Sequence, residues 1–242
     1  MLTLFFVDQL PTAVGSTYEF NNDDAMHAIR VLRTTIGDVF NLSDGRGAWS
    51  RVQVITETKK SLNVKVLETG FEEPLDIAFT IIQGIPKGDR VKDAVELSTE
   101  GGADRIVMWK AARSIGKSDE KIDKLQRTAI EASKQSRRFR IPSVVGVATT
   151  EYIIDEIAKA DLAIVLHEAG TEHLSEIVSK FDKSTIKKVA IIIGPEGGLT
   201  DSEVDAFAGA GAKVALLGRP ILRSAHAGLA ALSALNTALS VW

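Results

Sequence analysis

The sequence predicts an α/β protein in two parts: a small β-barrel, then a mainly parallel sheet covered by helices on both faces. Short segments over residues 1–71 alternate in hydrophobicity or are rich in β-branched residues, which is typical of strands that close into a small barrel. From Asp76 onward, fully apolar segments alternate with helical ones, the pattern of a parallel sheet buried on both faces. We therefore expect domains over residues 1–71 and 72–242.

The composition is that of an ordinary globular protein with a sizeable core. The 242 residues are 45% hydrophobic and 25% charged, with a net charge of −3. The absence of cysteine excludes disulfides, thiolate catalysis and zinc–thiolate sites, and it suits a reducing cytosol. The apolar start is short and is interrupted by Asp8, and no window approaches the roughly 18 apolar residues of a membrane helix. We expect a cytoplasmic protein without membrane contact.

The first part should contain one helix among its strands. The helix is expected over residues 21–33, where Asn and Asp residues offer an N-cap and where Ala25, Ile29 and Leu32 share a face. The strands are expected over residues 3–8, 38–45, 48–57 and 61–68.

The second part should alternate strands with helices. Strands are expected over residues 77–82, 104–109, 162–168, 188–194 and 213–218. Helices are expected over residues 89–101, 119–137, 151–159, 171–180, 201–209 and 224–240. Because ligands of parallel sheets collect at the carboxyl ends of strands, the loops after these strands are the first candidates for a site.

The segment AIIIGPEGGLTDSEVDAF, residues 190–207, joins a buried strand to a helix through a glycine-rich loop. Glycines 194, 197 and 198 allow backbone conformations closed to other residues and let a ligand approach the main chain. Thr200 and Glu203 predict a capping box at the start of the helix. Glu196 would repel a phosphate, so the loop suits a neutral or cationic ligand. A tight strand-to-helix turn without a ligand is the alternative.

A second glycine marks the end of the following strand, at Leu217-Gly218. A short turn with Arg219 and Arg223 leads into a helix from Ser224 that is rich in alanine. Small side chains let another backbone come close. The helix either covers the sheet only or also forms a subunit interface.

No metal site and no nucleotide-phosphate loop is predicted. His167 and His173 are six positions apart, whereas two zinc ligands on one helix need a spacing of four. The segment GIPKGD lacks the ending of a P-loop, and no G-x-G-x-x-G follows a strand.

Several segments in order resemble the RsmE family of SPOUT-class RNA methyltransferases, which methylates N3 of a uridine in small-subunit (16S) ribosomal RNA. The segments that carry the resemblance are HAIRVLRTTIGD (27–38), QGIPKGDRVKDAVELSTEGGAD (83–104), EASKQSRRFRIP (131–142), LHE (166–168), IIIGPEGGLTDSEV (191–204) and LLGRPILRSAHAGLAAL (216–232). The family commonly reads L-G-x-R-I-L-R-x-E-T-A where this chain has LGRPILRSAHA. Arg219 and Pro220 are exchanged relative to that order, and Ala225-His226 replaces the common Glu-Thr, so any role of that acid does not carry over.

The resemblance implies a C-terminal SPOUT domain with a trefoil knot, an RNA-binding PUA-like N-terminal barrel, and S-adenosylmethionine bound in a bent form by three loops. The implied cofactor-binding residues are Leu166, His167, Glu168, Gly194, Pro195, Glu196, Gly197, Leu217, Gly218, Ile221, Leu222 and Arg223. Backbone groups of the last loop would hold the adenine. Glu196 would either face the cofactor's sulfonium or amino group, or cap a neighbouring backbone N–H.

Uracil N3 is a poor nucleophile while it carries its proton, so the reaction needs a proton acceptor. The sequence names no decisive base. His27 and His226 are candidates, although isolated histidines are more often surface or core residues. Arg30 and Arg33 share a helical face with His27 and could stabilise a uracil anion or bind phosphate, or form a solvated basic face.

The resemblance also implies an RNA-binding surface and a homodimer. Besides Arg30 and Arg33, the expected RNA-binding residues form a basic patch of the catalytic domain: Arg113, Lys134, Arg137, Arg138 and Arg140. Phe139 either stacks on a base or packs in the core. The substrate would be ribosomal RNA, naked or in the assembled small subunit. The alternatives are a SPOUT methyltransferase for another RNA such as tRNA, and an inactive RNA-binding module, which Ala225-His226 would permit.

Overall fold

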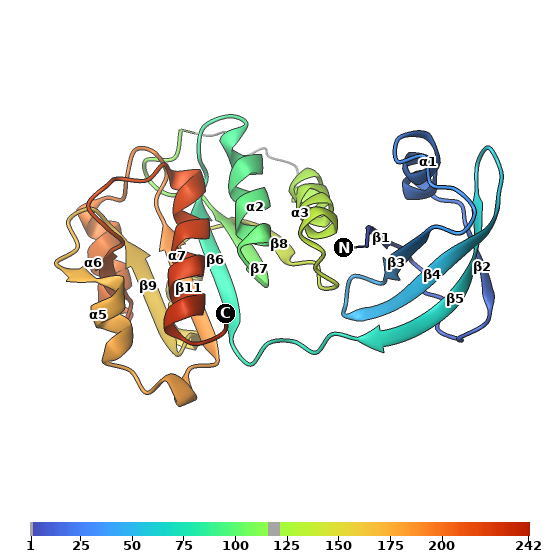
Figure 1. Cartoon of the computed structure of the whole chain (residues 1–242). Coiled ribbons are helices and arrows are strands. Elements are labelled where there is room, and N and C mark those ends of the chain that lie inside the picture. The colour runs from blue at the N-terminus through green and yellow to red at the C-terminus, as the bar shows by residue number, and fades with distance from the viewer. Residues whose placement is uncertain (1, 116–121) are drawn as a thin grey trace. The chain divides into compact units, whose positions relative to one another are not determined.

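The computed structural model describes residues 2–115 and 122–242 (Figure 1). The chain divides into two compact units. The N-terminal unit runs to Pro74 and also includes Ser133–Ile141, and the C-terminal unit comprises Leu75–Ala132 and Pro142–Trp242.

The N-terminal unit is built on a curled five-stranded sheet with the order β1-β3-β4-β5-β2. Its strands are β1 (Leu4–Phe6), β2 (Thr17–Phe20), β3 (Val39–Ser43), β4 (Ala48–Glu57) and β5 (Leu62–Phe71). Strand β1 pairs parallel with β3, and the other neighbours are antiparallel. Three aromatic rings fill the core, because Phe5, Phe20 and Phe40 lie 5.3 to 5.7 Å apart between ring centroids.

Helix α1 (Asp23–Arg30) begins as the sequence predicts and ends earlier. The Asn22 side chain accepts a hydrogen bond from the Ala25 N–H at 3.0 Å, which caps the helix. The predicted helix over residues 21–33 is wrong at its end. Arg33 adopts a left-handed backbone with φ of 56°, and Leu32 is 47% exposed instead of lying on the buried face.

The C-terminal unit contains a seven-stranded sheet in which all neighbouring strands are parallel, with the order β10-β12-β9-β11-β6-β7-β8. Its strands are β6 (Ala78–Gly84), β7 (Arg105–Trp109), β8 (Ser143–Ala148), β9 (Leu162–Leu166), β10 (Glu172–His173), β11 (Lys188–Ile193) and β12 (Lys213–Leu216). The sequence missed β2, β8 and β10, and each of them lies at an edge of its sheet. An edge strand is paired on one side only and need not be apolar along its length, which explains β2 (TYEF) and β10 (EH), whereas β8 (SVVGVA) is apolar and was nevertheless not predicted.

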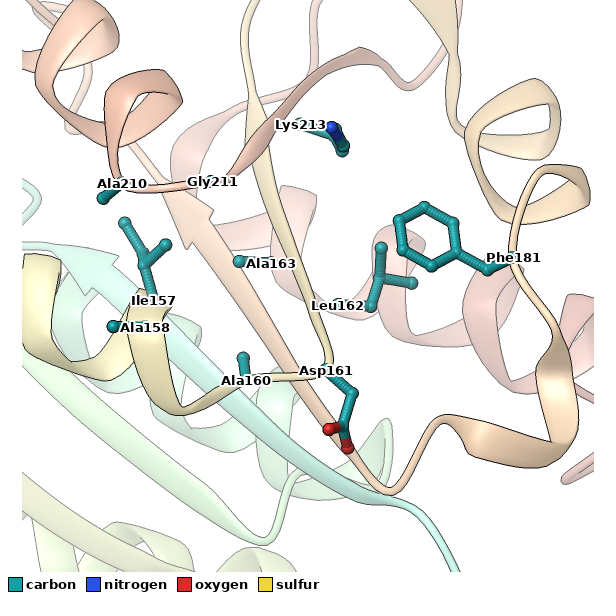
Figure 2. Close-up of a pocket in the computed structure, with 10 residues that line it drawn as sticks. All are labelled: Ile157, Ala158, Ala160, Asp161, Leu162, Ala163, Phe181, Ala210, Gly211 and Lys213. Carbon is teal, nitrogen blue, oxygen red and sulfur yellow. The ribbon is translucent and has the colours of Figure 1, made fainter.

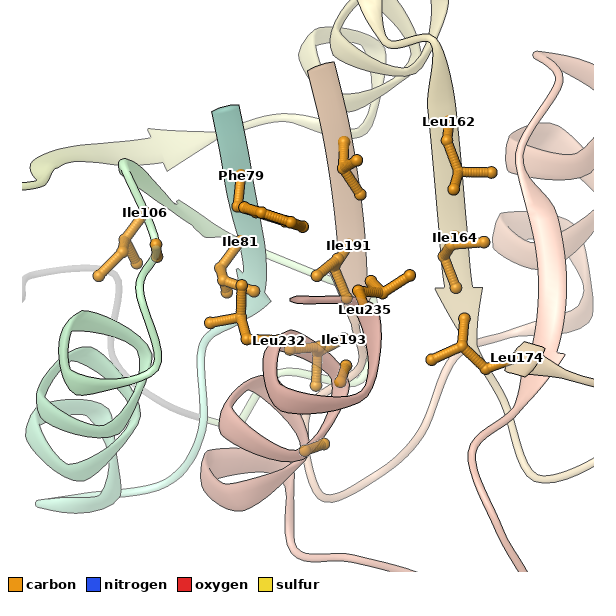
Figure 3. Close-up of a cluster of buried hydrophobic side chains, with 14 of the residues drawn as sticks. Phe79, Ile81, Ile106, Leu162, Ile164, Leu174, Ile191, Ile193, Leu232 and Leu235 are labelled. Carbon is orange, nitrogen blue, oxygen red and sulfur yellow. The ribbon is translucent and has the colours of Figure 1, made fainter. Parts of the chain in front are cut away.

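Helices cover both faces of this sheet. They are α2 (Arg90–Glu100), α3 (Ile122–Ser136), α4 (Thr150–Lys159), α5 (Leu174–Ser179), α6 (Asp201–Gly209) and α7 (Ser224–Ala238). The core under α2, α5 and α7 includes Ile191 and Ile193 (Figure 3). Ile192 points to the opposite face and lies in the core under α4 and α6. The predicted helix over residues 119–137 corresponds to α3, and its first three positions lie outside the described residues.

The connection from β12 to α7 carries the chain back across the sheet. Strand β12 lies beyond β9, whereas α7 packs against β11, β6 and α2. A Cβ on Gly228 would lie 3.0 Å from Ser98 Oγ and 3.3 Å from Ile193 Cδ1, so this glycine permits the close approach of α7. The predicted class, an α/β domain preceded by a small β domain, is confirmed. Among the described residues, no helix has the length and apolar character to cross a membrane.

Candidate functional site

The three loops expected to form a site follow three neighbouring parallel strands. Residues 166–168, 194–198 and 217–223 follow β9, β11 and β12, which are adjacent in the order β12-β9-β11. Because parallel strands end at the same edge of a sheet, the fold brings these loops together there. Strand β6 lies on the other side of β11, and its carboxyl end adds a fourth segment to this edge.

The glycines of the 194–198 loop have different structural reasons. Gly198 adopts φ of 71°, a conformation that other residues rarely adopt. A Cβ on Gly197 would lie 3.0 Å from both the Cβ and the carbonyl oxygen of Arg113, so this position needs glycine to admit a neighbouring loop. A Cβ on Gly194 would press on Leu199 at 3.1 Å. Packing within the protein thus explains part of the glycine pattern.

Arg113 and Ala112, in the loop after β7, are held on this glycine loop by hydrogen bonds. The Arg113 guanidinium donates to the carbonyl oxygens of Gly197, at 3.3 Å, and Leu199, at 3.0 Å. The carboxylate of Glu203 is buried and accepts from the Ala112 N–H at 2.7 Å. It also accepts from the N–H of Thr200 at 2.8 Å, so the predicted capping box is present and at the same time fastens a second loop.

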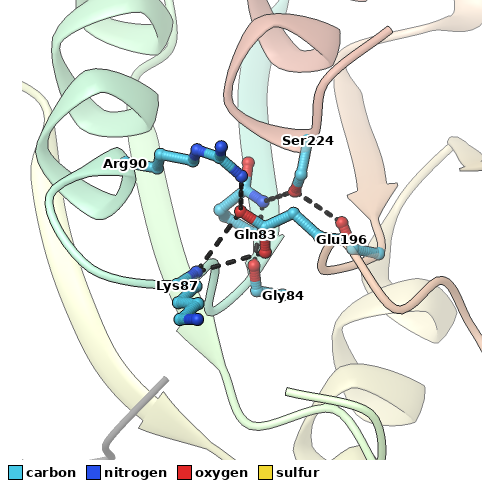
Figure 4. Close-up of polar contacts among 7 residues, drawn as sticks. Gln83, Gly84, Lys87, Arg90, Glu196 and Ser224 are labelled. Atoms are coloured by element: carbon cyan, nitrogen blue, oxygen red, sulfur yellow. Dashed lines mark hydrogen bonds and ion pairs between the residues drawn. The ribbon is translucent and has the colours of Figure 1, made fainter. Parts of the chain in front are cut away.

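Glu196 faces the turn between β6 and α2 (Figure 4). Its Oε2 accepts from the Lys87 N–H at 3.1 Å, and its Oε1 accepts from Arg90 Nη1 at 2.9 Å. Of the two roles expected for this acid, the structure therefore contains the cap on a neighbouring backbone N–H.

The surroundings of Glu196 favour its ionised form. Partial burial raises its pKa, but hydrogen bonds from Arg90, from its own backbone and from the Lys87 N–H, together with the Arg90 charge, outweigh burial and lower the pKa below the ordinary 4.5. This acid is therefore an anion that is already paired.

A series of buried hydrogen bonds links β6, α7 and the glycine loop (Figure 4). Gln83 is 1% exposed, and its Nε2 donates to the Gly84 carbonyl at 2.9 Å and to Ser224 Oγ at 2.8 Å. The Ser224 hydroxyl donates to the Gly194 carbonyl at 2.6 Å. We did not predict Gln83 as a site residue. A polar residue at the end of the apolar run IAFTIIQ is the signal that could have found it.

The loop after β12 exposes apolar side chains. Ile221 is 78% exposed and Leu222 is 41% exposed, while no atom comes closer than 3.9 Å to a Cβ placed on Gly218. In the loop after β9, His167 Nδ1 accepts from the Ala169 N–H at 3.2 Å. The edge thus offers an open backbone segment bordered by apolar side chains, which suits a flat apolar ring.

A cavity of about 320 Å³ lies elsewhere in this unit, near the amino ends of β9 and β12 (Figure 2). It is lined by Leu162, Phe181 and Lys213 among others, and by no residue of the predicted site. In the described part of the chain, no group of His, Asp and Glu residues could hold a metal ion.

Known proteins match this chain along nearly its whole length. Residues 72–236 match the RNA methyltransferase domain family, and residues 20–67 match the RNA methyltransferase PUA domain. The ribosomal RNA small subunit methyltransferase E of Mycobacterium tuberculosis is 35% identical, with 99% of this chain and 93% of the relative covered. The enzyme of that name from Bacillus subtilis is 30% identical over 91% of this chain and 90% of its own. The chain belongs to this family of RNA methyltransferases.

Solved structures share the fold. The ribosomal RNA small subunit methyltransferase E from Neisseria gonorrhoeae, bound to S-adenosyl methionine, has a TM-score of 0.86 at 24% identity and covers 98% of both chains. A probable rRNA-methyltransferase from Porphyromonas gingivalis has a TM-score of 0.82 at 27% identity over 99% of both chains. The SPOUT class and its knotted domain are consistent with this family.

The candidate catalytic residues of this methyltransferase lie in different units. His27, Arg30 and Arg33 are exposed in the N-terminal unit, and His226 is exposed in the first turn of α7 in the C-terminal unit. Because α1 ends at Arg30, Arg33 does not continue the helical face of His27 as predicted. It instead borders an open cavity of about 510 Å³ with Lys59 and three threonines.

The expected RNA-binding residues of the methyltransferase are also divided. Arg113 lies in the C-terminal unit, and the other four belong to the segment Ser133–Ile141 that packs in the N-terminal unit. There Lys134 pairs with Asp24 at 2.7 Å, and Arg137 Nε donates to the Leu2 carbonyl at 2.6 Å.

The end of this segment is fixed in the same way. Arg140 Nε donates to the Glu72 carbonyl at 2.9 Å. Phe139 stacks on Trp49 with ring centroids 5.6 Å apart, so of its two expected roles the structure contains packing against the protein. These residues fix the segment, and RNA binding by them stays a prediction.

Proposed function

We propose that this methyltransferase transfers the methyl group of S-adenosylmethionine to N3 of a uridine in small-subunit (16S) ribosomal RNA. The observation that carries the proposal is the meeting of three loops at one sheet edge, in a chain of the methyltransferase E family. The exposed apolar side chains and open backbone of one loop match the adenosine part of that cofactor.

The residues at this edge fit S-adenosylmethionine. Ile221 and Leu222 leave apolar surface uncovered, and the open backbone at Gly218 can pair with the edge of an adenine ring. The remaining residues that would hold the cofactor are Leu166, His167, Glu168, Gly194, Pro195, Glu196, Gly197, Leu217 and Arg223. When bound, the cofactor supplies an electrophilic methyl group on a positively charged sulfur.

The chain's own residues must orient the uracil and remove its proton. The N3–H proton passes to a base, the N3 electron pair forms the new bond to the methyl carbon, and the electron pair of the carbon–sulfur bond stays with sulfur. His226 is the base candidate in the unit that holds the three loops, and His27 is the candidate in the N-terminal unit. Arg30 and Arg33 would stabilise the uracil anion or bind a phosphate.

The methyltransferase would bind RNA through both units and act as a homodimer in the cytoplasm. Arg30, Arg33, Arg113 and the cations of Ser133–Ile141 supply positive charge for the phosphates. The partly exposed small residues of α7, Ala230, Ser233 and Ala234, support a second copy on this helix. A chain without cysteine suits the reducing cytoplasm.

The test is transfer of tritiated methyl groups to ribosomal RNA from cells that lack this modification, with naked RNA, small subunits and tRNA compared. We expect label at N3 of one uridine in ribosomal RNA, and comparing naked RNA with subunits identifies the substrate form. Label in tRNA alone would refute ribosomal RNA as the substrate. Absence of cofactor binding at millimolar concentration in calorimetry would leave an inactive RNA-binding module.

Two sets of variants test the residues. Ile221→Asp should weaken cofactor binding, whereas Val14→Asp, which alters an apolar residue that is 65% exposed in the N-terminal unit, should not. Replacing Arg137 and Arg138 together by alanine should weaken RNA binding and flatten its salt dependence by about one unit of slope per lost phosphate contact. A pair of exposed lysines, Lys183 and Lys187, provides the charge-matched control. If the arginine variant binds RNA as tightly as the wild type, Arg137 and Arg138 are not part of the RNA-binding surface.

A further inference from the structure

We propose that Glu196 is a positioning residue: it locks the turn between β6 and α2 against the glycine loop, and it does not recognise the positive charge on the cofactor's sulfur. The turn comprises Ile85–Asp89 and would form a fourth wall of the cofactor site. This inference rests on the proposed function, because it assigns a role within that site.

The strand order directs Glu196 away from the other cofactor loops. The loops after β12, β9 and β11 occupy one side of the edge, and β6 lies on the opposite side of β11 from β9. The contacts of Glu196 are with Lys87 and Arg90, both beyond the end of β6 (Figure 4). Its side chain therefore reaches toward the β6 side, whereas the cofactor loops lie on the β9 side.

The carboxylate of Glu196 is already used. Both oxygens accept from the Lys87 N–H, at 3.1 and 3.4 Å, and Oε1 also accepts from Arg90 at 2.9 Å. The guanidinium balances the negative charge of the carboxylate. An anion that is paired in this way has little remaining attraction for a sulfonium, which would have to compete with Arg90.

The turn needs this support. Residues 87–90 are exposed, and the cap residue Asp89 makes no side-chain hydrogen bond to α2. Gly84 precedes the turn, and a Cβ placed there would lie 2.8 Å from the Cδ of Pro195, so the strand end already touches the glycine loop. Glu196 extends this contact by one backbone and one side-chain hydrogen bond to the exposed part of the turn. Glu196 thus joins the exposed part of the turn to the glycine loop, in addition to the backbone bonds in which the Gly88 and Asp89 carbonyls accept from the N–H groups of Val91 and Lys92 in α2.

Comparing two cofactor forms separates positioning from recognition of the sulfonium charge. S-adenosylhomocysteine has the same adenosine and amino-acid groups as S-adenosylmethionine but lacks the methyl group and the charge on sulfur. If Glu196 positions the turn, Glu196→Gln should weaken binding of both forms by the same factor, about tenfold, in calorimetry. Arg90→Gln should act alike, and the double variant should bind little worse than either single variant. Glu100→Gln, at an exposed acid that ends α2, is the control and should change neither affinity.

A second measurement tests, in the absence of any ligand, whether Glu196 holds the turn between β6 and α2. Hydrogen exchange of the 85–90 segment should become faster in Glu196→Gln and stay unchanged in Glu100→Gln. Loss of affinity for S-adenosylmethionine at least tenfold greater than that for S-adenosylhomocysteine would overturn the proposal in favour of charge recognition. Unchanged exchange in the 85–90 segment would also overturn it. A wild-type protein that binds neither form would instead refute the proposed function. The exchange result would still decide whether Glu196 holds the turn between β6 and α2.

Discussion

Replacing Glu203 by alanine should destabilise the C-terminal unit more than any ordinary change of a helix acid. The carboxylate is 6% exposed and accepts from the N–H groups of Ala112 and Thr200, at 2.7 and 2.8 Å. Leaving a backbone N–H without its acceptor costs about 1 kcal/mol when the group is partly buried, and losing a helix cap contributes on the order of 1 kcal/mol more. The Ala112 N–H and the capping-box bond to the Thr200 N–H together account for a fall of about 2 kcal/mol in the free energy of unfolding.

The assay is urea unfolding followed by tryptophan fluorescence, together with hydrogen exchange of residues 110–115. Exchange should become faster in Glu203→Ala, because the Ala112 N–H loses its acceptor. Asp205→Ala removes an exposed acid from the same helix and should change stability by less than about 0.5 kcal/mol. If the two variants unfold at the same urea concentration, Glu203 does not join the two loops as we infer.

Three further predictions concern packing and pH. Gly170→Ala should lower stability by about 1 to 3 kcal/mol, because the new Cβ would lie 2.7 Å from a backbone nitrogen of β12. Gly209→Ala, where nothing lies within 4 Å of the new Cβ, should instead stabilise the helix end slightly. Thermal melts of both variants beside the wild type measure the two changes, and a shift of melting temperature in the opposite direction would contradict either prediction. The advantage of the wild type over Glu196→Gln in melting temperature should be full above pH 4.5 and vanish as pH falls through the lowered pKa of Glu196, so an advantage that grows in acid would contradict the assignment. Phe139→Ala should cost about 1 to 2 kcal/mol and shift the emission of Trp49, because the stacked pair is lost, and unchanged emission would argue against the stack.

Local pattern predicted the central elements of the fold and failed at its margins. The central strands β9 and β11 are almost wholly apolar and β6 is largely so, because each has neighbours on both sides and helices on both faces. The edge strands β2 and β10 lack that signal, whereas β8 (SVVGVA) carries it and was not predicted. The end of α1 was also misplaced, since the apolar spacing continues to Leu32 while the backbone leaves the helix after Arg30.

The candidate site shows the same division. The resemblance identified three loops, and strand order confirms that they follow adjacent strands. Gln83 escaped notice because its importance depends on Ser224, which is 141 residues away in the sequence. The sequence suggested that Gly197 lets a ligand approach the main chain, whereas the structure shows that this glycine also makes room for Arg113.

The sequence by itself determined the elements whose causes are local: the buried strands, the capping box of Thr200 and Glu203, and the glycine loop with its acid. Only the tertiary structure decided what that acid does. Glu196 meets Lys87, 109 residues earlier in the chain, because β11 and β6 are neighbours in the sheet. Strand order is set by the burial of the whole sheet rather than by any short segment, so no local pattern could name the partner of Glu196.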